Sequence, residues 1–334
     1  MDLKPIGPFG TPVTGRIEDL PDLLLGGAVF NQQFNDHPEQ LPAEEILRTG
    51  FTHGIRAIDT SPYYGPSEII LGEALKKLKP EIPREWYYIV TKCGRLFLDE
   101  FDYSPEWIRK SVLRSLERLD TTYLDLVYLH DIEFVEEDKI FGALAELKKL
   151  KDEGIIKHFG LSGYPVDFLF YISKKAVTTP SVGPLDAVLS YSNFNLQNER
   201  LRDYISKFYE ECKLKKLLCA SILSMSLLRS GPTHEFHPAS KELRDKCQEV
   251  AALTAAENVE LADLATRFAL REFLPHGPVV LGVSNLKELN SAIEQYWNVK
   301  ENKSDDDALV KKVKEAFGEH HNEVWGSGIP HKMN

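Results

Sequence analysis

Short apolar runs alternate with segments of helical periodicity along nearly the whole chain. Ile108, Val112, Leu116 and Leu119 recur at spacings of four, four and three residues, which places them on one face of a helix. Strands that alternate with helices predict a parallel sheet that is buried on both faces. The apolar runs are Leu23–Ala28, Ile55–Asp59, Tyr87–Lys92, Leu124–His130, His158–Ser162, Ala187–Tyr191, Lys216–Ser221 and Val279–Gly282.

Eight such units favour an α/β fold in which residues 1–334 form one closed (β/α)8 TIM barrel as a single domain. An open, doubly wound sheet is the alternative. Residues 1–21 are rich in Pro and Gly and form an N-terminal extension that we expect at the barrel floor. Ile222–Pro278 is long enough to predict extended loops at the C-terminal face, and residues 298–334 form a C-terminal segment.

Composition and charge exclude several classes of function. The chain is 43% hydrophobic and 27% charged, as in ordinary globular proteins, and its net charge of −11 argues against binding nucleic acid or an anionic membrane. No apolar run approaches the ~20 residues that span a bilayer. The start lacks a secretory signal, and Cys93, Cys212, Cys219 and Cys247 are scattered, so we expect reduced thiols in a cytoplasmic protein. The histidine spacing indicates no metal site.

Three consecutive predicted strands end in polar residues of different chemistry. Asp59, Lys92 and His130 end the second, third and fourth strands, and Tyr64 follows on the loop after Asp59. Because parallel strands of a barrel open their carboxyl ends on one face, these side chains should converge there. A phenol has a pKa near ~10, and a nearby ammonium lowers it. We therefore expect Lys92 to activate Tyr64 as an acid/base group, Asp59 to hold Lys92, and His130 to orient a substrate oxygen.

Each of these residues also has a structural interpretation. A strand-end Asp is commonly a turn or cap residue, a strand-end Lys reaches solvent, and a lone His is commonly satisfied inside the fold. Taken singly, these interpretations are the stronger ones. The occurrence of all four polar residues at neighbouring strand ends favours catalysis.

The chain resembles the aldo-keto reductases over nearly its whole length. The motifs are Asp59-Thr-Ser-x-x-Tyr-Gly65, Thr91-Lys92 and the run from Arg114 through Tyr123 to His130. The resemblance implies a (β/α)8 barrel with NAD(P)(H) and a catalytic tetrad of Asp59, Tyr64, Lys92 and His130. The family spacing of five residues selects Tyr64 over Tyr63.

The resemblance also implies where a dinucleotide would bind. The chain has no G-x-G-x-x-G between a strand and a helix, which argues against a Rossmann dehydrogenase. In the family the dinucleotide lies over the barrel mouth. Gly163 stands where an Asn usually contacts the carboxamide, and Ala220 replaces a stacking aromatic. The implied cofactor-binding residues are Gly27, Ala28, Ser162, Gly163, Tyr191, Ser221, Leu223, Ser224, Met225, Gly282, Val283, Ser284, Asn285, Glu288 and Ala292.

Glu288 aligns with a position at which many NADP-using members carry a basic residue for the 2′-phosphate. A carboxylate repels that phosphate and accepts a hydrogen bond from a free 2′-hydroxyl. The alternative is an ordinary exposed helix glutamate. The sequence therefore predicts NAD as the preferred cofactor.

Within the family, the chain resembles the subgroup of fungal NAD-dependent D-arabinose 1-dehydrogenases. Gly160–Pro165, Ala187–Gln197, Ala220–Arg229 and Ser327–His331 carry this resemblance. It implies oxidation of the anomeric carbon of D-arabinose to the lactone, towards D-erythroascorbate, with a small sugar as the partner. The alternatives are an L-galactose- or L-fucose-type aldose 1-dehydrogenase and a non-catalytic, dinucleotide-binding regulatory barrel. The sequence does not define the oligomeric state.

Overall fold

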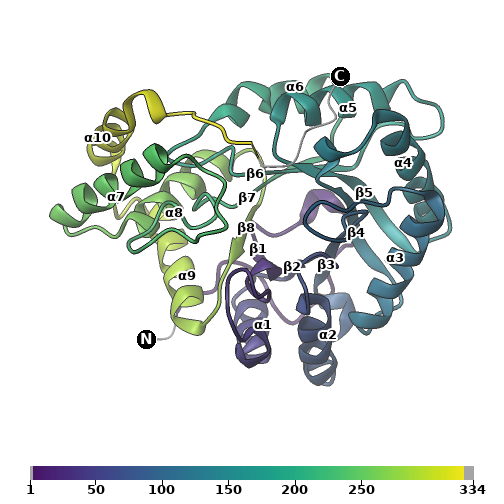
Figure 1. Cartoon of the computed structure of the whole chain (residues 1–334). Helices are drawn as coiled ribbons and strands as arrows, with labels where there is room; N and C mark the ends of the chain where they lie inside the picture. The colour runs from purple at the N-terminus through teal and green to yellow at the C-terminus, as the bar shows by residue number, and fades with distance from the viewer. Residues whose placement is uncertain (1–2, 327–334) are drawn as a thin grey trace.

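The computed structural model describes residues 3–326 and shows a closed barrel of eight parallel strands (Figure 1). Each strand pairs with the next along the chain, and β8 pairs with β1, where Leu25 lies opposite Leu281. The prediction of a (β/α)8 barrel is confirmed, and the alternative of an open sheet is wrong. The strands are β1 Leu23–Gly26, β2 Ala57–Asp59, β3 Tyr88–Cys93, β4 Leu124–His130, β5 Ile156–Gly163, β6 Ala187–Tyr191, β7 Lys216–Ala220 and β8 Val279–Gly282.

Helices surround the barrel, and two of them lie outside the simple repeat. The helices are α1 Ala43–Thr52, α2 Ser67–Leu78, α3 Pro105–Arg118, α4 Glu137–Asp152, α5 Val166–Val177, α6 Ile205–Glu210, α7 Lys241–Ala256, α8 Leu261–Phe273, α9 Leu286–Lys300 and α10 Asp307–Phe317. The additional helices α7 and α10 pack against each other at the left of Figure 1. Short 3-10 helices are η1 Ile17–Asp19, η2 Gly27–Val29, η3 Pro38–Gln40, η4 Arg84–Trp86, η5 Ile132–Phe134, η6 Arg200–Tyr204 and η7 Gly318–His320.

Local sequence signals explain where several helices begin and end. Ser104 Oγ accepts a hydrogen bond from Trp107 N at 3.3 Å and caps α3, with Pro105 at the first helical position. Gly154 takes a φ of +77° just after α4, a conformation that glycine adopts without strain. Ile108 and Val112 are buried on the face of α3 that the periodicity predicted. These signals mark where each helix turns back to the next strand.

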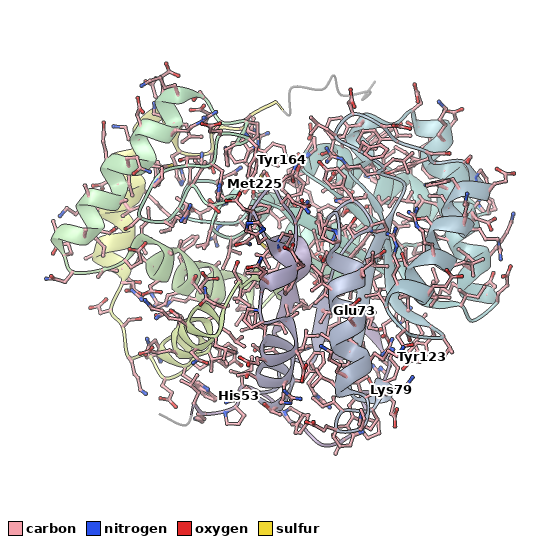
Figure 2. All side chains as sticks on the ribbon, turned by 60° about the horizontal axis from the view of Figure 1, so that its bottom comes forward. His53, Glu73, Lys79, Tyr123, Tyr164 and Met225 are labelled. Carbon is pink, nitrogen blue, oxygen red and sulfur yellow. The ribbon has the colours of Figure 1, made fainter. Side chains whose placement is uncertain are left out.

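The N-terminal extension fills one end of the barrel. Ile17 and Leu20 are buried in an interior cluster together with Leu24 and Tyr88, whose side chains point into the barrel. Figure 2 shows His53 and Tyr123, which follow α1 and precede β4, in the lower part of the view, while Tyr164 and Met225, after β5 and β7, lie in the upper part. The carboxyl ends of the strands therefore open on the face opposite the filled floor, as a barrel mouth.

The C-terminal segment returns to this mouth. Gln197 Nε2 donates hydrogen bonds to the carbonyls of His320 at 2.8 Å and Glu323 at 3.0 Å. Beyond them, the Trp325 ring stacks on Tyr164 with centroids 5.2 Å apart. Ser327–His331, which carried part of the resemblance, lies outside the described residues. Within residues 3–326, every helix is too short or too polar to cross a membrane.

Candidate functional site

Asp59, Lys92 and Tyr64 meet at the mouth, although they come from three places in the chain. Lys92 Nζ donates to Asp59 Oδ1 at 2.5 Å and to the Thr60 carbonyl at 3.0 Å. The same ammonium lies 4.9 Å from the centroid of the Tyr64 ring. Burial lowers the pKa of Lys92 and the Asp59 charge raises it, with a net upward shift. The proton of this buried pair therefore stays on the lysine, beside the phenol.

The pKa of Tyr64 differs from the expectation. Burial is the largest influence and raises this pKa to about 12, although the Lys92 charge lowers it. We expected a net lowering, because the sequence shows the ammonium but not the loss of water around the hydroxyl. Without a bound cofactor, Tyr64 is therefore a neutral phenol, which suits the acid form of an acid/base group.

His130 is held as a neutral imidazole between Ser61 and Asp131. Ser61 Oγ accepts from Tyr63 N at 3.1 Å and lies 3.0 Å from His130 Nδ1, to which its O–H can donate. Asp131 Oδ2 lies 3.5 Å from Nε2, and a carboxylate beside this nitrogen favours the tautomer with the ring proton on Nε2. Burial lowers the pKa of His130 to about 3. An uncharged Nε2–H donor can bind the oxygen of a carbonyl or hydroxyl substrate without changing charge near neutral pH.

The two phenols after β2 have different neighbours. The Tyr64 ring lies edge-on to His130 with centroids 5.5 Å apart, and it also faces Lys92. Tyr63 also lies edge-on to His130, at 5.6 Å, but its ring face is covered by Arg95, whose Cζ lies 4.0 Å from the centroid. The contact with Lys92 supports Tyr64 as the acid/base residue.

A second ion pair borders the tetrad and was missed in the sequence. Arg95 Nη1 donates to Asp131 Oδ2, and the same oxygen lies 3.5 Å from His130 Nε2. Both residues are nearly inaccessible, with side-chain exposures of 10% and 4%. Asp131 directly follows His130, and Arg95 lies three residues after Lys92. Their position just beyond the strand ends that carry Lys92 and His130 was the signal that could have found them.

Left-handed backbone conformations recur in the loop after β7. Ser221, Ser224, Met225 and Ser226 have φ values of +57°, +50°, +53° and +75°. The Ser224 and Met225 N–H groups donate to the Ser221 carbonyl and to Ser221 Oγ, each at 2.8 Å, so internal hydrogen bonds hold this tight loop. Ser224 Oγ is buried without a hydrogen-bond partner among residues 3–326. The cofactor contact expected for Ser221, Leu223, Ser224 and Met225 on this loop stays a prediction.

Glu288 takes part in the cap of α9. Asn285 Oδ1 accepts from Glu288 N at 3.0 Å, while Glu288 accepts from Ser284 N at 2.7 Å and from Asn285 Nδ2 at 2.8 Å. This is a reciprocal capping box. The Glu288 carboxylate therefore occupies backbone and side-chain donors at the helix start that an anionic ligand would otherwise use. Gly282 precedes this cap and is exposed, Val283 is buried, and Ala292 is buried further along α9.

The ends of β1, β5 and β6 supply the remaining predicted cofactor residues. Gly27 and Ala28 start η2 after β1. Ser162 on β5 is buried and donates its hydroxyl to the Leu129 carbonyl at 3.1 Å, and Tyr191 ends β6. A side chain at Gly163 would collide with Glu133 Oε2, a buried oxygen with no hydrogen-bond partner in the described part of the chain.

Glu133 was not predicted from the sequence. Burial is the main reason that its pKa rises to about 8, and the nearby Asp131 charge raises it further. Its Oε1 accepts from Tyr164 N at 3.0 Å. Glu133 therefore takes the space that the side chain of residue 163 would fill, which explains why glycine is compatible with this position.

Comparison with known proteins agrees with this arrangement. Residues 22–314 match the model of the Aldo/keto reductase family. The D-arabinose 1-dehydrogenase of Saccharomyces cerevisiae is 53% identical over 315 residues, 92% of this chain and 94% of that protein. The L-galactose dehydrogenase of Arabidopsis thaliana is 33% identical over 312 residues, 91% of each chain.

A solved structure shares the fold. An aldo-keto reductase from Bacillus halodurans in its holo form superposes with a TM-score of 0.65 at 20% identity, covering 97% of this chain and all of that one. Membership of the family implies a nicotinamide cofactor. The tetrad, the barrel and the match over most of the chain agree: this protein belongs to the aldo/keto reductase family.

Proposed function

We propose that this protein is an NAD-dependent aldose 1-dehydrogenase that oxidises the anomeric carbon of D-arabinose to the lactone. The observation that carries the proposal is the convergence of Tyr64, Lys92, Asp59 and His130 at the barrel mouth. The D-arabinose 1-dehydrogenase of S. cerevisiae, 53% identical over 92% of this chain, supports the choice of sugar.

The residues of the tetrad would divide the reaction between them. His130 donates its Nε2–H to the oxygen on the anomeric carbon and fixes the sugar. Tyr64, as the base, accepts the hydroxyl proton, and the Lys92 ammonium stabilises the phenolate that this role requires. Asp59 keeps Lys92 charged and in place through the 2.5 Å hydrogen bond.

The nicotinamide ring, when bound in its oxidised form, supplies the hydride acceptor and a positive charge. We expect the pKa of Tyr64 to be lower in that complex than its value of about 12 in the free protein, because a nearby positive charge favours the phenolate. Tyr64 is thus a protonated phenol in the free protein and becomes a better base when the oxidised cofactor is bound.

The preference for NAD over NADP rests on Glu288. Its carboxylate holds the Ser284 N–H and the Asn285 amide, donors that a 2′-phosphate at this helix start would need. A free ribose hydroxyl can donate to the same carboxylate. Both the charge of Glu288 and the occupied donors oppose the binding of a phosphate.

Four buried free cysteines fit the cytoplasmic location that we propose with this function.

The test is a panel of D-arabinose, L-galactose and L-fucose, each with NAD and with NADP, followed by NADH or NADPH absorbance. We expect the highest kcat/KM with D-arabinose and NAD. Because the relative from A. thaliana is an L-galactose dehydrogenase, preference for L-galactose would identify the second candidate. Tight dinucleotide binding without turnover of any sugar would favour the non-catalytic barrel and refute the proposal.

A further inference from the structure

The ion pair between Arg95 and Asp131 lies at the reaction centre, yet none of the steps above uses it. Asp131 Oδ2 lies 3.5 Å from His130 Nε2, the atom assigned to the substrate oxygen. Arg95 stacks over Tyr63 with its Cζ 4.0 Å from the ring centroid. The pair therefore borders the place where the reacting oxygen would lie.

The backbone holds this carboxylate in place at an energetic cost. Asp131 has a φ of +59°, a left-handed conformation that is unfavourable for a residue with a side chain. Its N–H donates to the Ser162 carbonyl at 2.9 Å, which anchors the residue to β5. Arg95 is anchored in turn, because its guanidinium donates to the carbonyls of Phe97 at 3.3 Å and Leu98 at 2.7 Å. Strained residues persist where surrounding contacts enforce them, and they cluster at functional sites.

The pair offers a charged acceptor and a charged donor. Burial raises the pKa of Asp131, but the Arg95 guanidinium that donates to it lowers this pKa, with a net shift below the ordinary value, so the carboxylate is ionised near neutral pH. The pKa of Tyr191 is raised mainly by burial and next by the Asp131 charge. The Asp131 charge also raises the pKa of Tyr64. The carboxylate thus lies within electrostatic range of phenols from two sides of the mouth. An ionised carboxylate has about four acceptor sites, so its contact with Arg95 leaves room for others.

We propose that Asp131 and Arg95 form a hydroxyl-binding subsite that recognises the sugar carbon next to the anomeric centre; this rests on the proposed function. Oxygens on adjacent sugar carbons lie about one hydrogen-bond length apart. A sugar whose anomeric oxygen contacts His130 Nε2 therefore presents its C2 hydroxyl to a carboxylate oxygen 3.5 Å from that nitrogen. Asp131 accepts from this hydroxyl, and Arg95 fixes the carboxylate. The subsite selects sugars that carry a C2 hydroxyl over their 2-deoxy analogues.

The competing interpretation is that Asp131 only positions His130. The two interpretations differ in what a missing hydroxyl does. A site that is built to bind a hydroxyl discriminates strongly against the analogue that lacks it, because its buried polar groups lose their partner. A residue that only positions the imidazole affects all substrates by the same factor.

The experiment compares kcat/KM for D-arabinose and for its 2-deoxy analogue, with NAD as cofactor. We expect the wild type to prefer D-arabinose by about 100-fold or more. Asp131→Asn should narrow this ratio by about tenfold or more, mainly through a higher KM for D-arabinose, and leave NAD binding unchanged. The Arg95→Lys variant keeps the positive charge but loses the planar guanidinium. It should also reduce the ratio of kcat/KM between D-arabinose and its 2-deoxy analogue.

The matched control is Asp125→Asn at the other end of the same strand. Asp125 pairs with Arg84 at 2.6 Å, with side-chain exposures of 2% and 13% that resemble those of the Asp131 pair. This substitution should lower the thermal midpoint without changing the ratio between the two sugars. A wild type that accepts both sugars equally, or variants that slow both by one factor, would overturn the subsite alone. Absence of turnover with any aldose would overturn the proposed function as well.

Discussion

Lys92 donates a 2.5 Å hydrogen bond to Asp59 in a place where both side chains are almost completely buried, with exposures of 2% and 5%. Removing one partner of a buried ion pair leaves an uncompensated charge, whereas replacing both partners is much less costly. Lys92 and Asp59 therefore contribute both to the stability of the barrel and to the acid/base chemistry at Tyr64.

Lys92→Met should lower the free energy of unfolding by about 3–5 kcal/mol and remove most sugar oxidation, because Asp59 is left unpaired and Tyr64 loses its cation. Denaturant unfolding and initial-rate measurements check both effects. The double variant Asp59→Asn/Lys92→Met should regain much of the stability but none of the activity. If the double variant were as unstable as the single one, the buried charge would not be the cause.

Tyr64→Phe should lower kcat by about 10²–10⁴-fold, because the proton of the anomeric hydroxyl loses its acceptor. Dinucleotide binding, followed by fluorescence titration, should stay nearly unchanged. Tyr63→Phe is the matched control, since Tyr63 lies beside the same imidazole but under Arg95. Substantial activity in Tyr64→Phe together with its loss in Tyr63→Phe would reverse the assignment of the two phenols.

Glu288→Arg should shift the ratio of kcat/KM for NAD and NADP towards NADP by about tenfold or more, since it replaces a repelling charge with an attracting one. Glu288→Gln is the control, because its amide oxygen can still accept from Ser284 N and preserve the helix cap. We expect this variant to lie between the wild type and Glu288→Arg. An unchanged ratio in Glu288→Arg would show that this carboxylate does not set the cofactor preference.

Glu133 should make the stability of the protein depend on pH between its unfolded and folded pKa values, from mildly acidic pH up to about 8. Its pKa is raised to about 8 in the folded protein, above the ordinary carboxyl value. A raised folded pKa gives stability that is complete below the unfolded pKa and is lost as the pH rises through about 8.

Glu133→Gln removes this ionisation and keeps an oxygen for Tyr164 N. Near pH 9 the variant should be more stable than the wild type, by an amount on the order of 3 kcal/mol, and the difference should shrink towards pH 5. Unfolding curves at several pH values measure this difference, with Glu73→Gln on the exposed face of α2 as the control. A difference that is constant with pH would mean that Glu133 does not titrate in this range.

The sequence by itself determined the framework of the protein. The alternation of apolar runs and helical periodicity predicted all eight strands to within about two residues at each end, because buried parallel strands need continuous apolar runs. It also predicted that Asp59, Lys92 and His130 would share one face, since the carboxyl ends of parallel strands in a barrel open on the same side. These conclusions depend on periodicity and chain direction, which follow directly from the order of residues along the chain.

Only the tertiary structure decided the electrostatic state of the site. The pKa of Tyr64 is raised, against the expectation from its charged neighbour, because the loss of water outweighs the ammonium. Ser61 and Asp131 lie beside the two ring nitrogens of His130, Arg95 holds Asp131 there, and Glu133 takes the space at Gly163. Burial and the direction of a side chain depend on which distant segments pack together, and a single residue after a strand end can turn towards the mouth or away from it. Composition and residue spacing therefore do not predict which way such a side chain turns.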